Sequence, residues 1–426
     1  MKKFSLTIIA LGGVAIPLGY WVIGLAPAFF GPGFFYDLGR LCALFAFVLL
    51  FFQYLLSARV KWIERGIGLD VLFGIHKKFG VLALCLVIAH PSLMFVGERL
   101  QGLASPFHLL KGLGVAALLL LLLSAGAALI HERLGLKYET WKGIHKTGYI
   151  LYPFAFVHSF LMGSTVQRGP VRLLWALLFF LFVLVLFFKA LRRWALRRRP
   201  FKVTEVRKEG PSVCTLFFQG KHRDYQPGQF MILQLKRSGA VSEPHPFTIS
   251  SSPTSDKLSV TVKGVGDFTS TVSQTSPSDS AYIDMPYGVF SFLNAPAEEV
   301  VFIAGGIGIT PFMSMLRYMN DRDMRRKVLL LWANKTEDDI LFREELAALE
   351  ENRLSLRIVH VLSRQDSWQG EKGHINREKL SKWVKDFGKP VFFICGPPLM
   401  MEAVKSELRN LGVPSKRILM ERFALR

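Results

Sequence analysis

The chain of 426 residues is long enough for two or three domains, and 51% of its residues are hydrophobic, which favours a membrane protein over a wholly soluble one. Its formal net charge of +21 raises the possibility of nucleic-acid binding, but the cations gather at the ends of apolar runs, as in 192–199, which indicates retention on the inner side of a membrane. The four cysteines form no CxxC pair, so neither a disulfide scaffold nor a zinc site is expected.

Six apolar stretches have the length of roughly 20 residues that a helix needs to cross a bilayer core of about 30 Å. They are 4–26, 38–58, 71–97, 109–131, 143–163 and 171–190. Cations are concentrated after the second, fourth and sixth stretches, so these connectors and both termini are predicted to be cytoplasmic. Residues 1–195 are therefore expected to form a six-helix domain in the lipid bilayer of the cell membrane (inner or plasma membrane), in a multi-pass arrangement.

The first stretch has a second interpretation. It follows Met1-Lys2-Lys3 and ends at Ala26-Pro27-Ala28, a pattern similar to a signal peptide with its cleavage site. Its apolar part is longer than in a typical signal peptide, so we expect it to be retained as a helix. Cleavage would leave the orientation of the later helices unchanged.

Four histidines lie in two of the predicted membrane helices. His76 and His90 are in the third and lie 14 positions apart. That spacing separates them by about 21 Å along the axis and leaves them about 40° from a whole number of turns, so both rings can share one face. Ionisable side chains at membrane depth are costly and therefore indicate function.

The second pair, His145 and His158, is 13 positions apart, which leaves the rings about 140° out of line in an ideal helix. Pro153 lies between them and predicts a kink that restores a common face. If the two helices are neighbours, His76 pairs with His145 near the inner surface and His90 with His158 near the outer one. Each pair can supply two axial ligands to a haem iron. The alternatives are polar residues satisfied between helices, or a proton relay.

This pattern resembles the transmembrane domain of the ferric reductases and NADPH oxidases, in which histidines at the matching positions bind two stacked b-type haems. The resemblance implies that the metal ligands are His76, His90, His145 and His158. Arg40 is similar to an arginine that the family places above the outer haem, although it also fits an interfacial anchor. Some superoxide-producing animal members have a histidine where Met94 stands, which leaves the terminal acceptor open.

Residues 200–295 contain short alternating segments separated by Gly, Pro and Asp, which predict an antiparallel β-barrel. The segment 245–248 offers an aromatic ring followed by a hydroxyl group, which suits a flavin. The segment 262–270 is a strand followed by a glycine turn with hydroxyl groups, which suits a pyrophosphate. Together they resemble the FAD domain of the ferredoxin-NADP reductase type. By that resemblance FAD contacts His245, Pro246, Phe247, Thr248, Val262, Lys263, Gly266, Thr269 and Ser270.

Residues 296–426 alternate strands and helices and predict a parallel, doubly wound α/β domain that binds NAD(P)H. The segment 305–311 leads from a strand through glycines into a helix, where the dipole favours a phosphate. The segment 395–400 ends a later strand, and in the resembled reductases it lies beside the nicotinamide, which gives Cys395 an orienting role. The expected nucleotide contacts are Gly305, Gly306, Gly308, Thr310, Pro311, Gly396, Pro397 and Met400.

Two further segments refine the nucleotide site by the same resemblance. Ser363 and Arg364 follow a strand where reductases that use NADPH bind the 2′-phosphate, and the forked guanidinium suits that dianion. NADPH is therefore favoured, and NADH stays open. Phe423, near the C-terminus, matches an aromatic residue that shields the flavin; core packing is the rival role.

The order of these parts predicts an enzyme that moves electrons from NAD(P)H to FAD, through two haems b, to an acceptor outside. A flavin is needed because hydride carries two electrons whereas each haem accepts one. The first hypothesis for the acceptor is dioxygen, reduced to superoxide. The second is a ferric or cupric complex, and the third is a partner protein that receives the electrons. No nucleic acid and no obligatory protein partner are expected.

Overall fold

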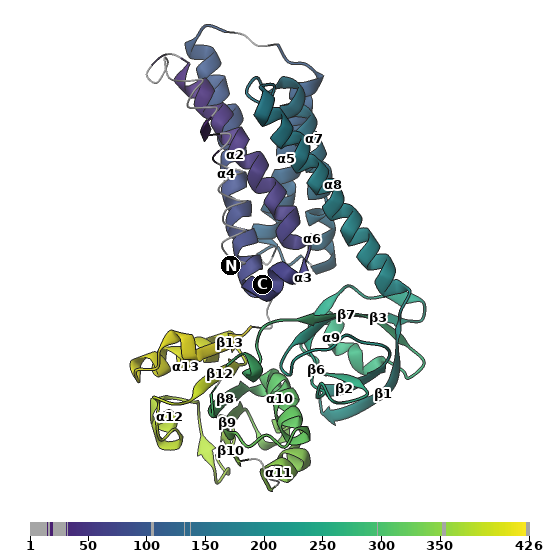
Figure 1. Cartoon of the computed structure of the whole chain (residues 1–426), viewed down its shortest axis with the longest axis vertical. Coiled ribbons are helices and arrows are strands. Elements are labelled where there is room, and N and C mark those ends of the chain that lie inside the picture. The colour runs from purple at the N-terminus through teal and green to yellow at the C-terminus, as the bar shows by residue number, and fades with distance from the viewer. Residues whose placement is uncertain are drawn as a thin grey trace. The chain divides into compact units, whose positions relative to one another are not determined.

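The computed structural model describes residues 15, 18–19, 31, 33–103, 106–131, 133–136, 138–295, 297–351 and 355–422. The predicted first membrane helix, 4–26, therefore lies outside the described residues apart from three positions. The chain divides into two compact units, Met1–Arg193 and Trp194–Arg426, which contain different kinds of structure (Figure 1).

The first unit is α-helical. Its described helices are α2 (Phe34–Ser57), α3 (Lys61–Ile67), α4 (Leu69–Leu100), α5 (Leu109–Ile130), α6 (Tyr138–His145), α7 (Gly148–Met162) and α8 (Gly169–Arg197). Within the described residues, four helices are long and apolar enough to cross a membrane: α2, most of α4, α5 and α8. Helix α7 has 15 residues and reaches only about 22 Å at about 1.5 Å per residue. Four of the six predicted spans are thus confirmed as apolar helices of sufficient length.

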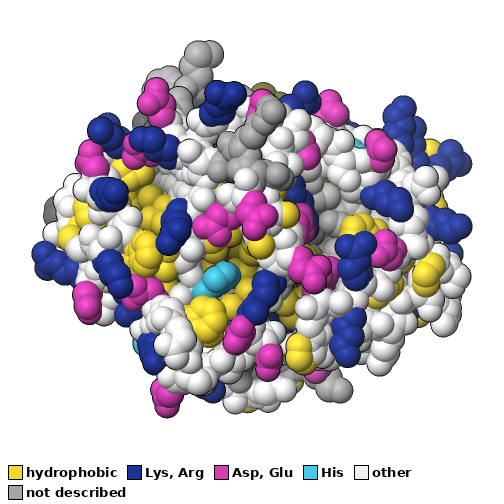
Figure 2. All heavy atoms as spheres, turned by 90° about the horizontal axis from the view of Figure 1, so that it is seen from below, with side chains coloured by type: hydrophobic (Ala, Val, Ile, Leu, Met, Phe, Trp, Pro, Cys, Tyr) yellow, Lys and Arg dark blue, Asp and Glu magenta, His cyan; other side chains and the backbone are white. Residues whose placement is uncertain are grey.

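The surface of the first unit is apolar in a way that water would disfavour. Among the described residues, only six exposed large hydrophobic side chains lie in the second unit, namely Trp194, Val241, Val265, Val289, Leu293 and Leu399. The others lie on the first unit and on α8, including Leu173 at 74% exposure and Phe187 at 58%. Such a surface fits lipid rather than water. Figure 2 shows another face of the molecule, on which cationic and anionic side chains are interspersed.

The segment that carries His145 and His158 is broken, but not where the sequence predicted. Helix α6 ends at His145, and α7 begins at Gly148 after a two-residue turn. Pro153 lies inside α7, which continues through it. The helix break in this segment therefore lies at Lys146 and Thr147, whereas Pro153 lies within a continuous helix. The chain turns earlier because backbone bonds of the i→i−3 type, such as Thr147 N to Ile144 O at 3.0 Å, replace those of an α-helix.

Glycines let the helices of this unit approach closely. A Cβ atom at Gly39 of α2 would lie 2.8 Å from Cγ of Met94 on α4, and one at Gly97 of α4 would overlap the backbone of Tyr36. Small residues at such contacts are typical of membrane helices, where van der Waals packing holds helices together.

The second unit begins with an antiparallel sheet, as predicted for 200–295. Its strands are β1 (Phe201–Gly210), β2 (Val213–Gln219), β3 (Phe230–Arg237), β4 (Ala240–Val241), β5 (His245–Thr248), β6 (Leu258–Lys263) and β7 (Ser280–Tyr287). They are ordered β4-β3-β7-β1-β2-β6, with β5 paired to β3. A short helix, α9 (Asp267–Ser270), follows β6. Alternate strand residues such as Val203, Leu216 and Val260 are fully buried and form the core.

The rest of this unit is a parallel sheet covered by helices on both faces. The strands are β8 (Glu299–Gly305), β9 (Lys327–Asn334), β10 (Ser355–Leu362), β11 (Glu371–Lys372), β12 (Val391–Cys395) and β13 (Ile418–Glu421), and the helices are α10 (Thr310–Asp321), α11 (Arg343–Glu351), α12 (Arg377–Trp383) and α13 (Pro398–Asn410). The order is β11-β10-β9-β8-β12-β13, and each strand pairs in parallel with its neighbours. The doubly wound prediction is confirmed, and the order reverses between β8 and β12, where such folds bind ligands.

Candidate functional site

The structure brings the four membrane histidines together in the expected pairs. His76 of α4 faces His145 at the end of α6, with ring centroids 6.1 Å apart. His90 of α4 faces His158 of α7, with ring centroids 6.3 Å apart. The turn between α6 and α7 resolves the spacing of 13, because the two histidines of that segment belong to different helices.

The rings of one pair are oriented by main-chain carbonyl groups. Nδ1 of His90 lies 2.9 Å from the carbonyl oxygen of Gly39, and Nδ1 of His158 lies 2.8 Å from that of Leu110. A carbonyl oxygen can only accept, so each Nδ1 carries the proton and donates it. Each Nε2 is then left with the lone pair that a metal ion requires.

The other pair is oriented by two polar side chains within apolar helices. Nδ1 of His145 lies 3.2 Å from Oγ of Ser124 and 3.3 Å from its carbonyl oxygen. One end of the Gln53 amide lies 3.0 Å from Nδ1 of His76. Helix α2 thus contacts both histidines of α4, and α5 contacts both of the others. Sequence reasoning missed Gln53 and Ser124, although a polar residue inside an apolar run was a signal available to it.

Helix α5 also leaves room for the His158 ring. A Cβ atom at Gly114 would lie 2.8 Å from Cε1 and 3.0 Å from Nε2 of His158. A Cβ atom at Gly126 on the same helix would meet nothing within 4 Å. The absence of a side chain at Gly114 therefore has a local purpose, since it lets the imidazole lie against the helix backbone.

The separation of the paired rings fits one metal ion between them. An imidazole nitrogen binds a transition metal at about 2.0–2.1 Å and lies about 1.1 Å from its ring centre, so two rings on opposite sides of one ion have centroids roughly 6.2–6.4 Å apart. The observed 6.1 and 6.3 Å agree with that value. Among the described residues, no group of three or more His, Cys, Asp or Glu side chains is placed to hold a metal ion.

Arg40 lies beside this region, next to Gly39 in the chain. Its guanidinium pairs with Asp37 at 2.8 Å and donates to the hydroxyl of Thr165, in the connector between α7 and α8. The structure therefore ties α2 to that connector through Arg40. Both roles considered for this residue, over a haem and as an anchor, are compatible with these contacts.

The predicted flavin strand β5 presents aromatic rings and one unpartnered hydroxyl group. The His245 ring stacks on Phe268 at 4.0 Å, and Phe247 lies 6.2 Å from the same ring. Thr248 is 5% exposed, and its Oγ1 has no hydrogen-bond partner among the described residues. A buried hydroxyl without a partner is costly, so it fits a site that a bound group completes. Phe268 was not singled out from the sequence.

Two of the predicted FAD contacts are already engaged within the protein. Oγ1 of Thr269 accepts from the N–H groups of Val265 and Gly266 at 3.0 and 2.9 Å, so it shapes the glycine turn. Nζ of Lys263 lies 3.3 Å from Oδ1 of Asp339. Burial raises the pKa of the Asp339 carboxyl, but Lys263 and Thr336 outweigh it, and the pKa lies below its ordinary value.

The two predicted nucleotide loops meet where the sheet order reverses. A Cβ atom at Gly308 would overlap the carbonyl oxygen of Cys395, and one at Gly305 would lie 2.7 Å from Sδ of Met400 and from Cδ of Pro397. Nε1 of Trp332 donates to the carbonyl oxygen of Gly306 at 3.0 Å and holds the loop before α10. Only glycine permits this close approach.

Cys395 lies at the end of β12 and is fully buried. Burial raises the pKa of its thiol well above the ordinary value, and the negative charge of Glu421 raises it further. A thiol in that state stays protonated and is a poor nucleophile. The expected orienting role is compatible with this environment.

The carboxyl ends of β9 and β10 hold the remaining candidates. The N–H groups of Ser363 and Arg364 donate to the carbonyl oxygens of Asn334 and Lys335 at 3.0 and 2.8 Å, so the two loops are joined. Asn334 is 6% exposed, and neither its amide nitrogen nor its amide oxygen has a partner among the described residues. Sequence reasoning missed it. Phe423 lies outside the described residues.

Comparison with known families covers most of the chain in three parts. Residues 42–156 match the ferric reductase like transmembrane component, 198–305 an FAD-binding domain, and 302–406 an oxidoreductase NAD-binding domain. This order matches the architecture of the NADPH oxidase and ferric reductase-like proteins. The chain thus combines a ferric reductase-like membrane component with an FAD-binding domain and an oxidoreductase NAD-binding domain.

Individual relatives are more distant. The chain is 30% identical over 54% of its length to the glycine betaine monooxygenase reductase subunit of Pseudomonas aeruginosa, and the match spans 65% of that protein, just under two thirds. It is 29% identical over 55% of its length to the stachydrine N-demethylase reductase subunit Stc4 of Rhizobium meliloti, spanning 69% of that protein. A flavohemoglobin structure from Malassezia yamatoensis aligns with 95% of this chain and 98% of its own, at 17% identity and a TM-score of 0.51, which concerns the fold alone.

Proposed function

We propose that this protein is a transmembrane NAD(P)H oxidase, which carries electrons from cytosolic NAD(P)H through FAD and two b-type haems to dioxygen outside, forming superoxide. The observation that carries the proposal is that two couples of histidines face each other in the helical unit. Within the couples, the ring centroids are 6.1 and 6.3 Å apart. A flavin and nucleotide unit in the same chain supplies the electron donor's half of the reaction.

The donor set of each couple favours a haem over a bare metal ion. Two imidazoles alone would be a sparse donor set for a bare metal ion, whereas a haem would bring the porphyrin nitrogens as its own ligands. His76 and His145 would hold one haem, and His90 and His158 the other. Held by two histidines each, the haems would supply one-electron transfer rather than chemistry on the metal. The Nδ1 contacts of His90 with α2, and of His145 and His158 with α5, would keep the Nε2 atoms of these three rings aimed at the iron.

The second unit would bind the flavin and nucleotide along one edge. The buried hydroxyl of Thr248 would donate a hydrogen bond to the flavin. The aromatic rings of His245, Phe247 and Phe268 would lie beside the flavin. When bound, FAD accepts the hydride of NAD(P)H as two electrons and releases them singly. The loops of Gly308 and Cys395 would position the nicotinamide, and Asn334 is a candidate contact for the ribose or phosphate groups.

The orientation follows from the charge pattern. Arg192 at the end of α8 donates to the carbonyl oxygens of Ala58 and Arg59, which gathers cations from two connectors at one end of the helical unit. Cations are retained on the cytoplasmic side, so we place this end, His76 and the flavin unit there. The couple of His90 and His158 would then lie nearer the outer surface.

The acceptor distinguishes this proposal from two alternatives. Outer-sphere transfer to dioxygen needs no metal-binding side chains on the protein. The reductase-subunit names of two relatives support a different alternative, in which the chain donates electrons to a partner protein.

Two measurements on the purified full-length protein in detergent test the proposal. A reduced-minus-oxidised spectrum with haem quantification is expected to give about two b-type haems per chain, and fewer would overturn the pairing. With NADPH, cytochrome c reduction is expected to be abolished by superoxide dismutase. Reduction of a ferric chelate that is insensitive to superoxide dismutase and persists without oxygen would support a ferric reductase instead. Electron transfer that occurs only after a partner protein is added would support the hypothesis that this chain donates electrons to a partner protein.

A further inference from the structure

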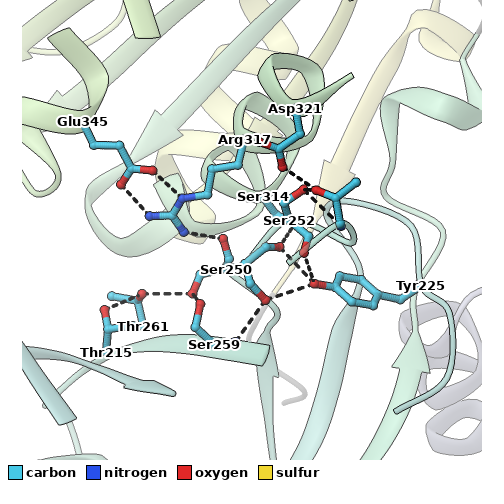
Figure 3. A network of polar contacts seen from close by, with 12 residues as sticks. Thr215, Tyr225, Ser250, Ser252, Ser259, Thr261, Ser314, Arg317, Asp321 and Glu345 are labelled. Carbon is cyan, nitrogen blue, oxygen red and sulfur yellow. Dashed lines mark hydrogen bonds and ion pairs between the residues drawn. The ribbon is translucent and has the colours of Figure 1, made fainter. Parts of the chain in front are cut away.

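One face of helix α10 lies on the barrel segment that follows the flavin strand β5 (Figure 3). Ser314, Arg317 and Asp321 are spaced by three and four residues, so they share a face of the helix. The barrel segment 250–254 begins two residues after Thr248. The same helix begins directly after the glycine loop at Thr310. Helix α10 therefore connects the predicted nucleotide loop to the predicted flavin strand.

Each residue of this helix face bonds to the segment. Oγ of Ser314 donates to the carbonyl oxygen of Ser251 at 2.6 Å, and Nη1 of Arg317 donates to that of Ser250 at 2.6 Å. At the far end of α10, the hydroxyl of Thr254 donates to Asp321.

The guanidinium of Arg317 is fixed from its own domain as well. Nε and Nη2 donate to the two carboxylate oxygens of Glu345 on α11, each at 2.6 Å. Such a two-point pair sets the plane of the guanidinium as well as its position. The plane also lies over the Phe342 ring, 5.2 Å from its centroid. The direction of the Nη1 group toward Ser250 is consequently fixed. The group cannot reorient if the backbone at Ser250 shifts.

The segment that receives these bonds is fixed from the barrel side. Oγ of Ser250 lies 2.9 Å from Oγ of Ser259 and accepts from Oγ1 of Thr261 at 3.1 Å. The hydroxyl of Tyr225 donates to the carbonyl oxygen of Ser252 at 2.8 Å. Strand β6 and the barrel core therefore hold the segment in place, so that Arg317 acts on a rigid part of the barrel.

We propose that Arg317 is a positioning residue for hydride transfer, which sets the distance between the nicotinamide and the flavin by joining helix α10 to the segment after β5. This inference rests on the proposed flavin and nucleotide sites. In the reaction the C4–H bond of the nicotinamide breaks, and the hydride passes with both electrons to N5 of the flavin, leaving NAD(P)⁺. A displacement of about 1 Å between reacting atoms can slow such a step by about 10²-fold.

Arg317 borders a cleft of about 1130 Å³ rather than the apolar core, so its replacement is compatible with folding. The test is anaerobic stopped-flow reduction of the flavin by NADPH in the full-length protein. For Arg317→Gln we expect the limiting rate at saturating NADPH to fall by about 10-fold or more. We expect the dissociation constant for NADPH to change by less than about threefold, and the isotope effect with 4-deuterated NADPH to rise.

Companion variants separate positioning from general stability. Arg322→Gln removes the same charge from the exposed end of α10, away from segment 250–252, and is expected to behave like the unmodified protein. Arg317→Lys retains the charge but not the two-point pair with Glu345, and is expected to recover part of the rate. Glu345→Gln, which leaves Ser250 its donor, is expected to lower the limiting rate less than Arg317→Gln.

An unchanged limiting rate and isotope effect in Arg317→Gln, with only a lower melting temperature, would overturn the inference and leave Arg317 a structural tie. Flavin absorbance per chain reports whether each variant is folded and contains FAD. If Arg317→Gln loses its flavin, the limiting rate of Glu345→Gln becomes the test. A limiting rate in Glu345→Gln equal to that of the unmodified protein would count against the positioning role. Failure of NADPH to reduce the flavin of the unmodified protein would instead refute the proposed function.

Discussion

His90 and His158 face each other with ring centroids 6.3 Å apart, and Nδ1 of each ring donates a hydrogen bond to a main-chain carbonyl oxygen of another helix. Because carbonyl oxygens are present whatever the side chain, this arrangement fixes the imidazoles without a further polar residue. The couple is the sharpest target for testing the proposed route of electrons.

We expect His158→Ala to reduce the haem content from about two per chain to about one, because one axial ligand of the outer haem is lost. NADPH would still reduce the flavin, but transfer to the external acceptor would fall by at least about 10²-fold, a lower bound for a broken relay. Haem quantification and superoxide assays measure both effects. His108→Ala, at the exposed position before α5, serves as the control and is expected to keep both haems. Two haems in His158→Ala would refute the assignment.

Gly114→Ala tests the space beside the same ring. The added Cβ atom would lie 2.8 Å from Cε1 of His158, so the ring must move and the outer haem spectrum is expected to weaken or broaden. Gly126→Ala makes the same change on the same helix, where nothing lies within 4 Å. It is expected to be neutral or slightly stabilising, since alanine favours the helix by roughly 0.5–1 kcal/mol. Equal spectra for the two variants would contradict the role of Gly114.

Thr248→Val tests the buried hydroxyl of the flavin strand. The replacement keeps the shape of the side chain and removes an oxygen that has no partner among the described residues, so the flavin-free protein should not lose stability. Affinity for FAD is expected to fall by about fivefold, as for the loss of one hydrogen bond of about 1 kcal/mol. Fluorescence titration of the flavin-free protein with FAD gives the affinity, and an unchanged value would exclude a contact through Oγ1.

For Asn334→Leu we expect effects of opposite sign on stability and binding. A buried amide without partners costs about 1–3 kcal/mol, so an apolar side chain of similar size should raise the melting temperature of the nucleotide-free protein. If Asn334 bonds the nucleotide, the KM for NADPH should rise at the same time. Thermal melts with and without NADPH separate the two effects. A higher melting temperature with unchanged KM would mean that the nucleotide does not reach this residue.

The buried side chain of His360 is expected to make the stability of the folded protein depend on pH. Burial, and secondarily the charge of Arg343, lowers the pKa of His360 to about 4, against about 6.5 in the unfolded chain. Between these values the unfolded state binds the proton and the folded state does not, so this contribution is complete above pH of about 6.5 and is lost as the pH falls toward about 4. His360→Leu should flatten the melting temperature over that window, and an unchanged slope would contradict the assignment.

Much of the fold followed from patterns that depend on local sequence. The antiparallel and parallel sheets were predicted because strand spacing and glycine turns are short-range signals, and the histidine pairs because 14 positions nearly complete four turns. The turn after His145 was not predicted. Pro153 offered an obvious irregularity, whereas Lys146 and Thr147 carry no strong turn signal, and the turn depends on tertiary packing such as the bond from Tyr54 to the Gly148 carbonyl.

The candidate site was predicted only where chemistry and motif coincide. Gly39 and Leu110 contribute carbonyl groups, which every residue has, so no sequence signal marks them. Gly114 and Arg317 act through partners that are distant along the chain, at His158 and Ser250. Contacts of this kind become visible only when the helices and the two halves of the second unit are packed.

The turn between α6 and α7 has a consequence for how the bundle tolerates length changes. Helix α4 is continuous from Leu69 to Leu100, so one residue inserted between His76 and His90 would rotate one ring by about 100° relative to the other. A residue inserted at Lys146 or Thr147 would enter a segment that is already non-helical and would alter the loop instead of the phase of α7. The spacing of one histidine pair is thus constrained by the phase of a helix, whereas that of the other is constrained only by the length of a loop.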